Sequence, residues 1–139
     1  MWFHDAIYDP KRHDNEAKSA DWARAVALGA KLPNEVAGRI HQLVMATRHD
    51  TEPSGSDEKV TVDVDLSILG APADRFDEYE AQVREEYAWV PDIAFRARRR
   101  AIVGGFLARE AIFNTSRFAE AYEARARSNL ERSLRRLGA

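Results

Sequence analysis

His4 and Asp5 place two metal-ligating residue types side by side near the start of the sequence, between the apolar residues Phe3 and Ile7. An imidazole nitrogen beside a carboxylate oxygen suits Mn, Fe, Co, Ni or Zn, whereas sites built from oxygen alone suit Mg or Ca. Neighbouring residues on a helix point about 100 degrees apart, so the two groups share an ion only if it lies between them. The doublet alone favours a histidine hydrogen-bonded to a neighbour over a metal site.

Asp63 and Asp65 alternate with valine and leucine in an apolar segment, where an unpaired carboxylate would be costly. One interpretation is that one of them faces solvent while the other caps a turn or meets an arginine. The alternative is that one of them ligates a cation that His4 and Asp5 also hold. Both interpretations remain open from the residues.

The remaining histidines are His13, His41 and His49, and the chain has no cysteine, so any metal must use histidine and carboxylate ligands. His13 falls in an expected loop, and His41 lies off the apolar stripe of its helix. His49 follows the expected end of a helix near Arg48, where a cationic side chain suits the helix dipole. None of the three is assigned as a ligand, and His49 is the best of them as a pocket residue.

The composition indicates one globular domain over residues 1–139, because 45% of the residues are hydrophobic and 32% are charged. The net charge of −2 excludes a uniformly basic nucleic-acid binder. The charge is sorted, however, at −9 over residues 1–92 and +7 over residues 93–139. The acidic part contains every candidate ligand, and we interpret the basic part as helical structure whose positive charge offsets these acids.

Membrane and nucleic-acid roles are not expected. No apolar run approaches the roughly 20 residues of a membrane helix, and the N-terminus lacks the pattern of a signal peptide, so a cytoplasmic location is predicted. The arginines at 96 and 98–100 point in several directions on one helix, which favours salt bridges within the domain over nucleic-acid binding.

Apolar spacing predicts helices almost throughout, with glycine and proline at the joints. The expected helices run from Asp14 or Asn15 to about Ala30, from about Pro33, over 58–69, after Pro72, after Pro91, and from Thr115 or Ser116. The first has alanines on or near one face, at positions 17, 20, 23, 27 and 30. The second has the apolar stripe expected when one face packs on a core: Val36, Ile40, Leu43, Val44 and Thr47. Residues 49–59 have the composition of a solvated loop. The valines at 60, 62 and 64 alternate as in a strand, but no partner strand is evident, so a helix is predicted there.

Several ordered motifs resemble the metal-dependent phosphohydrolases of the HD superfamily. They are WFHDAIYD at 2–9, DNEAKSA at 14–20, DVDLSILGAP at 63–72, REEYAWVPD at 84–92 and NLER near the C-terminus, so the resemblance covers nearly the whole chain. It implies an all-α helical bundle in which a first His, a His-Asp doublet and a later Asp hold a divalent ion that activates water for attack on a phosphate ester.

Carried over residue by residue, the resemblance assigns His4 and Asp5 to the doublet and Asp65 to the later ligand, with Asp63 as the alternative. The first His of the family lies on a helix upstream of the doublet. The chain starts three residues before the doublet, so we expect a bundle that lacks its N-terminal helix or helices and the first ligand. The ion would be Mn, Fe, Co, Ni, Zn or Mg.

The resemblance also suggests roles around the ion. Asp5 or Glu16 would relay a proton, although a first-turn acid stabilised by the helix dipole explains Glu16 equally well. The candidates for binding the substrate phosphate are Lys11, Arg12, Arg48 and His49.

The sequence therefore predicts hydrolysis of a phosphate ester of a small molecule or nucleotide. The alternative is a catalytically impaired or non-catalytic helical module that self-associates through apolar surface near the N-terminus.

Overall fold

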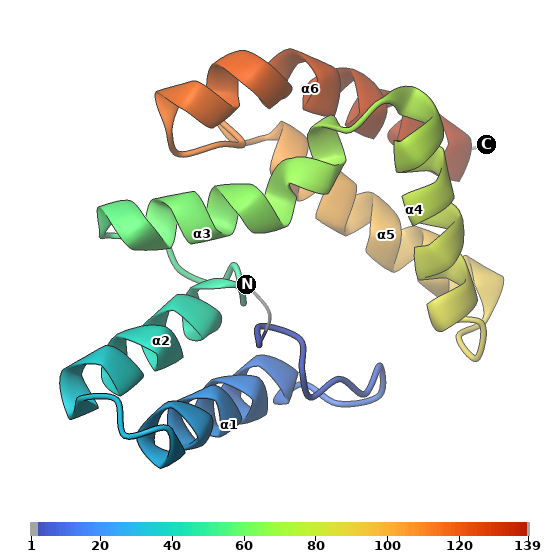
Figure 1. Ribbon diagram of the computed structural model, residues 1–139. Helices are drawn as coiled ribbons and strands as arrows, with labels where there is room; N and C mark the ends of the chain where they lie inside the picture. The colour runs from blue at the N-terminus through green and yellow to red at the C-terminus, as the bar shows by residue number, and fades with distance from the viewer. Residues whose placement is uncertain (1–2, 139) are drawn as a thin grey trace. The chain divides into compact units, whose positions relative to one another are not determined.

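The computed structural model describes residues 3–138 and contains six α-helices and one short 3₁₀ helix, with no strand among these residues. The all-α class predicted from the sequence is confirmed. The chain divides into two compact units, Met1–Asp65 and Leu66–Ala139, which we describe separately. The elements, labelled in Figure 1, are α1 (Asn15–Gly29), α2 (Asn34–Ala46), α3 (Ser56–Leu66), η1 (Ser67–Gly70), α4 (Ala73–Glu86), α5 (Asp92–Leu107) and α6 (Ser116–Gly138).

In the first unit, α1 and α2 lie side by side and bury a small core between them (Figure 1). The buried centre consists of Ala20, Ala23 and Val44, and partly buried side chains including Phe3 and Ile40 pack against it. Alanine at the contact positions lets the two helix backbones approach closely, because little side-chain volume separates them. The alanine face predicted for the first helix is therefore buried at its centre, whereas Ala30 at its end is exposed.

The buried face of α2 differs from the predicted stripe at its first turn. Val36 was expected in the core but is 42% exposed, and the adjacent Ala37 is fully buried instead. One residue turns a helix by about 100 degrees, so this difference rotates the contact face towards the smaller side chain. Val44 and Thr47 are buried, as the stripe predicted.

Residues 56–66 form a helix, which resolves the ambiguous valine alternation in favour of the helical prediction. The helix starts at Ser56, so the loop predicted over 49–59 ends earlier than expected. The predicted helix over 58–69 also ends sooner, because η1 takes over at Ser67 with the tighter 3₁₀ geometry.

In the second unit, α6 carries the buried Leu130 and holds η1 through side-chain hydrogen bonds. The Asn129 amide Nδ2 donates to the carbonyl oxygens of Leu69 and Ala71, each at 2.9 Å. These bonds satisfy carbonyls that the short helix leaves open at its end. Gly70 packs so closely on α6 that a side chain there would meet Tyr122.

The buried face of α5 contains an arginine. Arg99 is buried beside Val103 and pairs with Glu80 on α4, whereas the apolar residue Ile102 is 42% exposed. Arg96 pairs with Asp92 one turn earlier at 2.8 Å. Salt bridges within the unit, as the sequence predicted, therefore engage two arginines of the basic run.

No helix within residues 3–138 is long and apolar enough to cross a membrane.

Candidate functional site

His4 and Asp5 lie in a turn that precedes α1, and two side chains of α1 hold this segment in place. The Ser19 hydroxyl accepts a hydrogen bond from the Ile7 amide at 2.9 Å and donates one to the Ile7 carbonyl at 3.1 Å. One turn earlier, Asn15 makes the same reciprocal pair with the backbone of Asp9, at 3.0 and 2.8 Å. Both side chains are buried, so α1 positions the turn by satisfying its backbone N–H and C=O groups at Ile7 and Asp9.

Asp14 occupies the N-cap position of α1, as predicted, but its side chain makes no capping hydrogen bond. Instead it accepts two hydrogen bonds from Arg12, each at 2.8 Å, and lies 3.4 Å from the Lys18 ammonium. The hydrogen bonds from Arg12 hold the pKa of Asp14 well below its usual range. The Asp14 carboxylate therefore pairs with Arg12 of the preceding loop and with Lys18 of α1, and it does not cap the backbone amides of the first helical turn.

The imidazole of His4 meets the carboxylate of Asp65, which lies in the last turn of α3. His4 Nε2 is 3.2 Å from Asp65 Oδ1, and both side chains are largely buried, at 26% and 21% exposed. The turn before α1 and the end of α3 thus bring together two residues that are far apart in the sequence. Both had been proposed from the sequence as ligands of one ion.

His49 contacts the other oxygen of the same carboxylate, with Nε2 at 2.6 Å from Asp65 Oδ2. Its backbone is in the left-handed region, with φ at 58°, just after α2 ends. The second ring nitrogen, Nδ1, is buried and has no hydrogen-bond partner among the described residues. The sequence proposed His49 as a substrate-binding residue, and the structure places it directly on a candidate ligand.

Asp5 lies on the opposite edge of the His4 ring. Its Oδ1 is 3.7 Å from His4 Nδ1, and its side chain is 65% exposed. A carboxylate at this edge can help to orient an imidazole, as partners of metal-ligating histidines commonly do. In this geometry Asp5 faces a different nitrogen of His4 from the one that Asp65 faces.

Asp63 is fully buried on α3, two residues before Asp65. Residues two apart on a helix point about 200 degrees away from each other, so the two carboxylates leave α3 on opposite sides. Of the two candidates for the later ligand, Asp65 is the one that contacts the imidazoles.

The donor types and spacing at His4 and Asp65 fit a divalent ion in part. Two ligands on one ion with bonds of about 2.1 Å lie about 3.0 Å apart in octahedral geometry and about 3.4 Å apart in tetrahedral geometry. The 3.2 Å between His4 Nε2 and Asp65 Oδ1 falls between these values. Within residues 3–138, however, no three His, Asp or Glu side chains converge as a ligand set. The pair offers two donor atoms that one divalent ion could share.

Four other residues were predicted for the site: Lys11, Arg12, Glu16 and Arg48. Arg12 is held by Asp14, and their hydrogen bond raises the pKa of Arg12. Arg48 lies 3.2 Å from Asp50, Lys11 has an exposed side chain, and Glu16 stands in the first turn of α1. The first-turn position agrees with the dipole explanation of Glu16.

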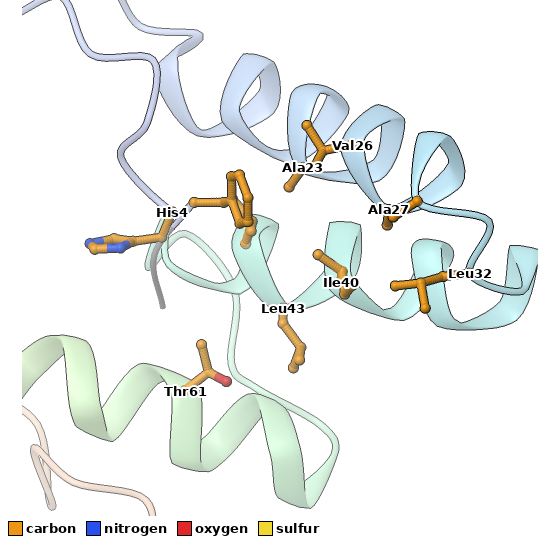
Figure 2. A pocket seen from close by; sticks show the side chains of 11 residues that line it. His4, Ala23, Val26, Ala27, Leu32, Ile40, Leu43 and Thr61 are labelled. Atoms are coloured by element: carbon orange, nitrogen blue, oxygen red, sulfur yellow. The ribbon is translucent and has the colours of Figure 1, made fainter.

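Sequence reasoning missed a pocket of about 420 Å³ that reaches His4 (Figure 2). It lies in the first unit, with α1 and α2 forming most of its wall and Thr61 of α3 and His4 completing it. The signal in the sequence was the run of alanines on α1, which was interpreted only as a packing face. Small side chains on a helix also leave room beside it.

The chain matches no protein-family model, no curated protein and no solved structure in the comparisons made.

Proposed function

We propose that the protein is a divalent-metal-dependent phosphohydrolase acting on a phosphate monoester. The observation that supports this most is the 3.2 Å contact between His4 Nε2 and Asp65 Oδ1. These residues were assigned to one ion by the resemblance to HD-superfamily proteins, and the fold brings them together from separate elements. Asn15 and Ser19, two residues of the second motif, anchor the turn that carries His4.

In this proposal His4 and Asp65 hold the ion, and Asp5 supplies either a third ligand or the orientation of His4. A bound divalent ion lowers the pKa of water towards neutrality and polarises a phosphoryl oxygen. His49 orients Asp65 through its 2.6 Å contact. Asp5, which is exposed beside the His4 ring, is placed to accept a proton from the attacking water.

Substrate phosphate would be bound by the basic side chains that flank this cluster. Arg48 is the best placed in sequence, because it precedes His49, and its exposed partner Asp50 can be displaced by a dianionic phosphate. Arg12 is the weaker candidate, since two hydrogen bonds already commit its guanidinium to Asp14.

The test combines thermal melting with phosphate release. Mn²⁺, Co²⁺, Ni²⁺, Zn²⁺ and Mg²⁺ are each added to the protein, and p-nitrophenyl phosphate is the substrate. At one hundred times the Kd, an ion stabilises the folded chain by about 2.7 kcal/mol, which raises Tm by about 8 °C for a domain of this size. His4→Ala and Asp65→Asn should abolish both effects, whereas His13→Ala, at an exposed loop position, should keep them. Unchanged melting with all five ions and no phosphate release would refute the proposal.

A second candidate function is self-association without catalysis, favoured by apolar side chains left exposed on the first unit. Those exposed on or next to α1 and α2 are Trp22, Val26, Leu28, Leu32 and Val36. Exposed apolar surface of this kind is typical of protein contact sites. Sedimentation velocity tests it: the sedimentation coefficient should rise with concentration, and Leu28→Glu should remove the rise. A concentration-independent monomer would exclude this function.

A further inference from the structure

The pocket beside His4 has a volume of about 420 Å³, within the range of small-molecule sites. Ala23, Ala27 and Val44, which are nearly fully buried, line its inner part, and Val26 and Leu32, which are exposed, line its outer part. Figure 2 shows His4 at one end of the pocket and Leu32 at the other. The pocket therefore runs between α1 and α2 and ends at His4, whose imidazole ring points away from the other labelled lining side chains.

The lining is almost entirely hydrocarbon. Nine of its eleven residues are aliphatic or aromatic, and the polar exceptions are Thr61 and His4. No Asp, Glu, Lys or Arg is among the described residues that line it. A sugar or a nucleobase placed here would bury donors and acceptors with too few partners, and each such group would weaken binding by about tenfold. A hydrocarbon group has no hydrogen bonds to lose, and its transfer from water into the pocket is favourable.

We propose that this pocket binds the hydrocarbon part of the substrate, so that the substrate is a phosphate monoester of an apolar alcohol. The proposal rests on the proposed phosphohydrolase function for its phosphate end, and on the pocket alone for its apolar end. His4 links the two, because it lines the pocket and its Nε2 contacts Asp65. A phosphate at the His4–Asp65 pair would direct its ester chain along the pocket.

The volume sets the expected chain length. A cavity of about 150 Å³ holds the six carbons of benzene. By proportion, 420 Å³ holds at most about 16 carbons, and fewer where the outer part is open. Alkyl groups of about eight carbons should therefore fit completely, and affinity should still be rising with chain length between four and eight carbons.

The first experiment measures binding without catalysis. Calorimetry of the metal-free full chain with 1-butanol, 1-hexanol and 1-octanol should show Kd falling by about fourfold for each added methylene. Glycerol, which offers hydroxyls in place of methylenes, should not bind. No binding of 1-octanol, or a Kd that does not change with chain length, would overturn the proposal.

A matched pair of variants locates the binding. Val26→Asp places a charge in the pocket wall, whereas Val36→Asp places the same charge at an equally exposed position of α2 outside the lining, at 41% and 42% exposed. Val26→Asp should weaken 1-octanol binding by at least tenfold, and Val36→Asp should leave it unchanged. Equal effects of the two variants would overturn the proposal.

A second pair fills space without adding charge. Ala27→Leu extends a side chain into the pocket, and Ala25→Leu extends one from the exposed side of the same helix. Ala27→Leu should shorten the longest alkyl group that still improves binding by about three carbons, and Ala25→Leu should not. Circular dichroism melting of each variant verifies that it folds, and the Val26/Val36 pair decides the matter if Ala27→Leu unfolds.

Hydrolysis then separates this inference from the proposed function. With metal present, kcat/KM should rise from ethyl to octyl phosphate and fall again for Val26→Asp. Hydrolysis of ethyl and octyl phosphate at equal kcat/KM would overturn the pocket assignment and leave the phosphohydrolase proposal intact. Alcohol binding with the expected chain-length dependence but no hydrolysis would keep the pocket and refute the phosphohydrolase. If a second copy of the chain occupied the pocket instead, the sedimentation coefficient would rise with concentration, Val26→Asp would abolish that rise, and no alcohol would bind. This result would also overturn the inference.

Discussion

Replacing Ser19 with alanine should release the turn that carries His4 while α1 stays folded. The Ser19 hydroxyl is fully buried and makes two hydrogen bonds with Ile7, one as acceptor and one as donor. Alanine has nearly the same volume and a higher helix propensity, so the helix itself is not weakened. The loss falls on the Ile7 amide and carbonyl, which are left without the partner that α1 provides.

The size of the effect follows from these two bonds. Each hydrogen bond contributes about 1–1.5 kcal/mol, so the closed turn loses about 2–3 kcal/mol relative to the open one. That corresponds to an increase of roughly 30-fold to 150-fold in the opening equilibrium. Because Asn15 still holds Asp9, the opening should be largest before residue 9.

Amide hydrogen exchange measures this opening directly. In Ser19→Ala, exchange at Ile7 should accelerate by roughly 30-fold or more, while amides in the middle of α1 keep their protection. Ser128→Ala, an exposed serine of α6, is the control and should leave the whole first unit unchanged. Equal exchange at Ile7 in wild type and Ser19→Ala would refute the argument that α1 positions the site through this side chain.

Two further predictions concern the second unit. Gly70→Ala would place a Cβ 2.6 Å from the Tyr122 Cβ and 2.9 Å from its carbonyl oxygen, so overpacking should lower the free energy of unfolding by about 3 kcal/mol. Gly104→Ala, which has open space around it, should instead raise Tm. Equal melting temperatures of the two variants would contradict the packing argument. Hydrogen bonds, chiefly from Arg132, lower the pKa of Asp77, so its stabilising effect is present above its unfolded pKa of about 3.9 and is lost as pH falls through the lower folded pKa. The Tm advantage of wild type over Asp77→Asn should therefore be full at pH 6 and should shrink as pH falls below about 4. An advantage that stays unchanged at the lowest pH would contradict this assignment.

The helices could be predicted because their signals are local. Pro33, Pro72 and Pro91 immediately precede three helices, and the apolar spacing after each of them has the helical period. The exact buried face was less predictable, since Val36 belongs to the stripe that was expected to pack on the core and is exposed. Which side of a helix is buried depends on the partner helix, and spacing within one segment does not contain that information. The single domain over residues 1–139 stays a prediction.

The candidate site was predictable in its members but not in its pairing. The motifs singled out His4 and Asp65, and left Asp63 open because both acids share one segment. Only the turn of α3 separates them, since it points Asp65 at the imidazoles and buries Asp63 on the other side. The contact of His49 with Asp65 could not be predicted, because it depends on how the α2–α3 loop returns to the end of α3. The divalent ion itself stays a prediction.

The left-handed backbone of His49 has a consequence for how the chain responds to selection for stability. Glycine and asparagine adopt a φ of 58° more readily than histidine does, so the backbone at this position costs roughly 1 kcal/mol that either residue would relieve. Both would also remove the buried Nδ1, which has no hydrogen-bond partner within residues 3–138. A library varied at residue 49 and screened for thermal resistance alone should therefore enrich glycine and asparagine, whereas a screen for turnover should retain histidine. Comparing the two enrichment profiles would separate the effect of His49 on stability from its contribution to turnover.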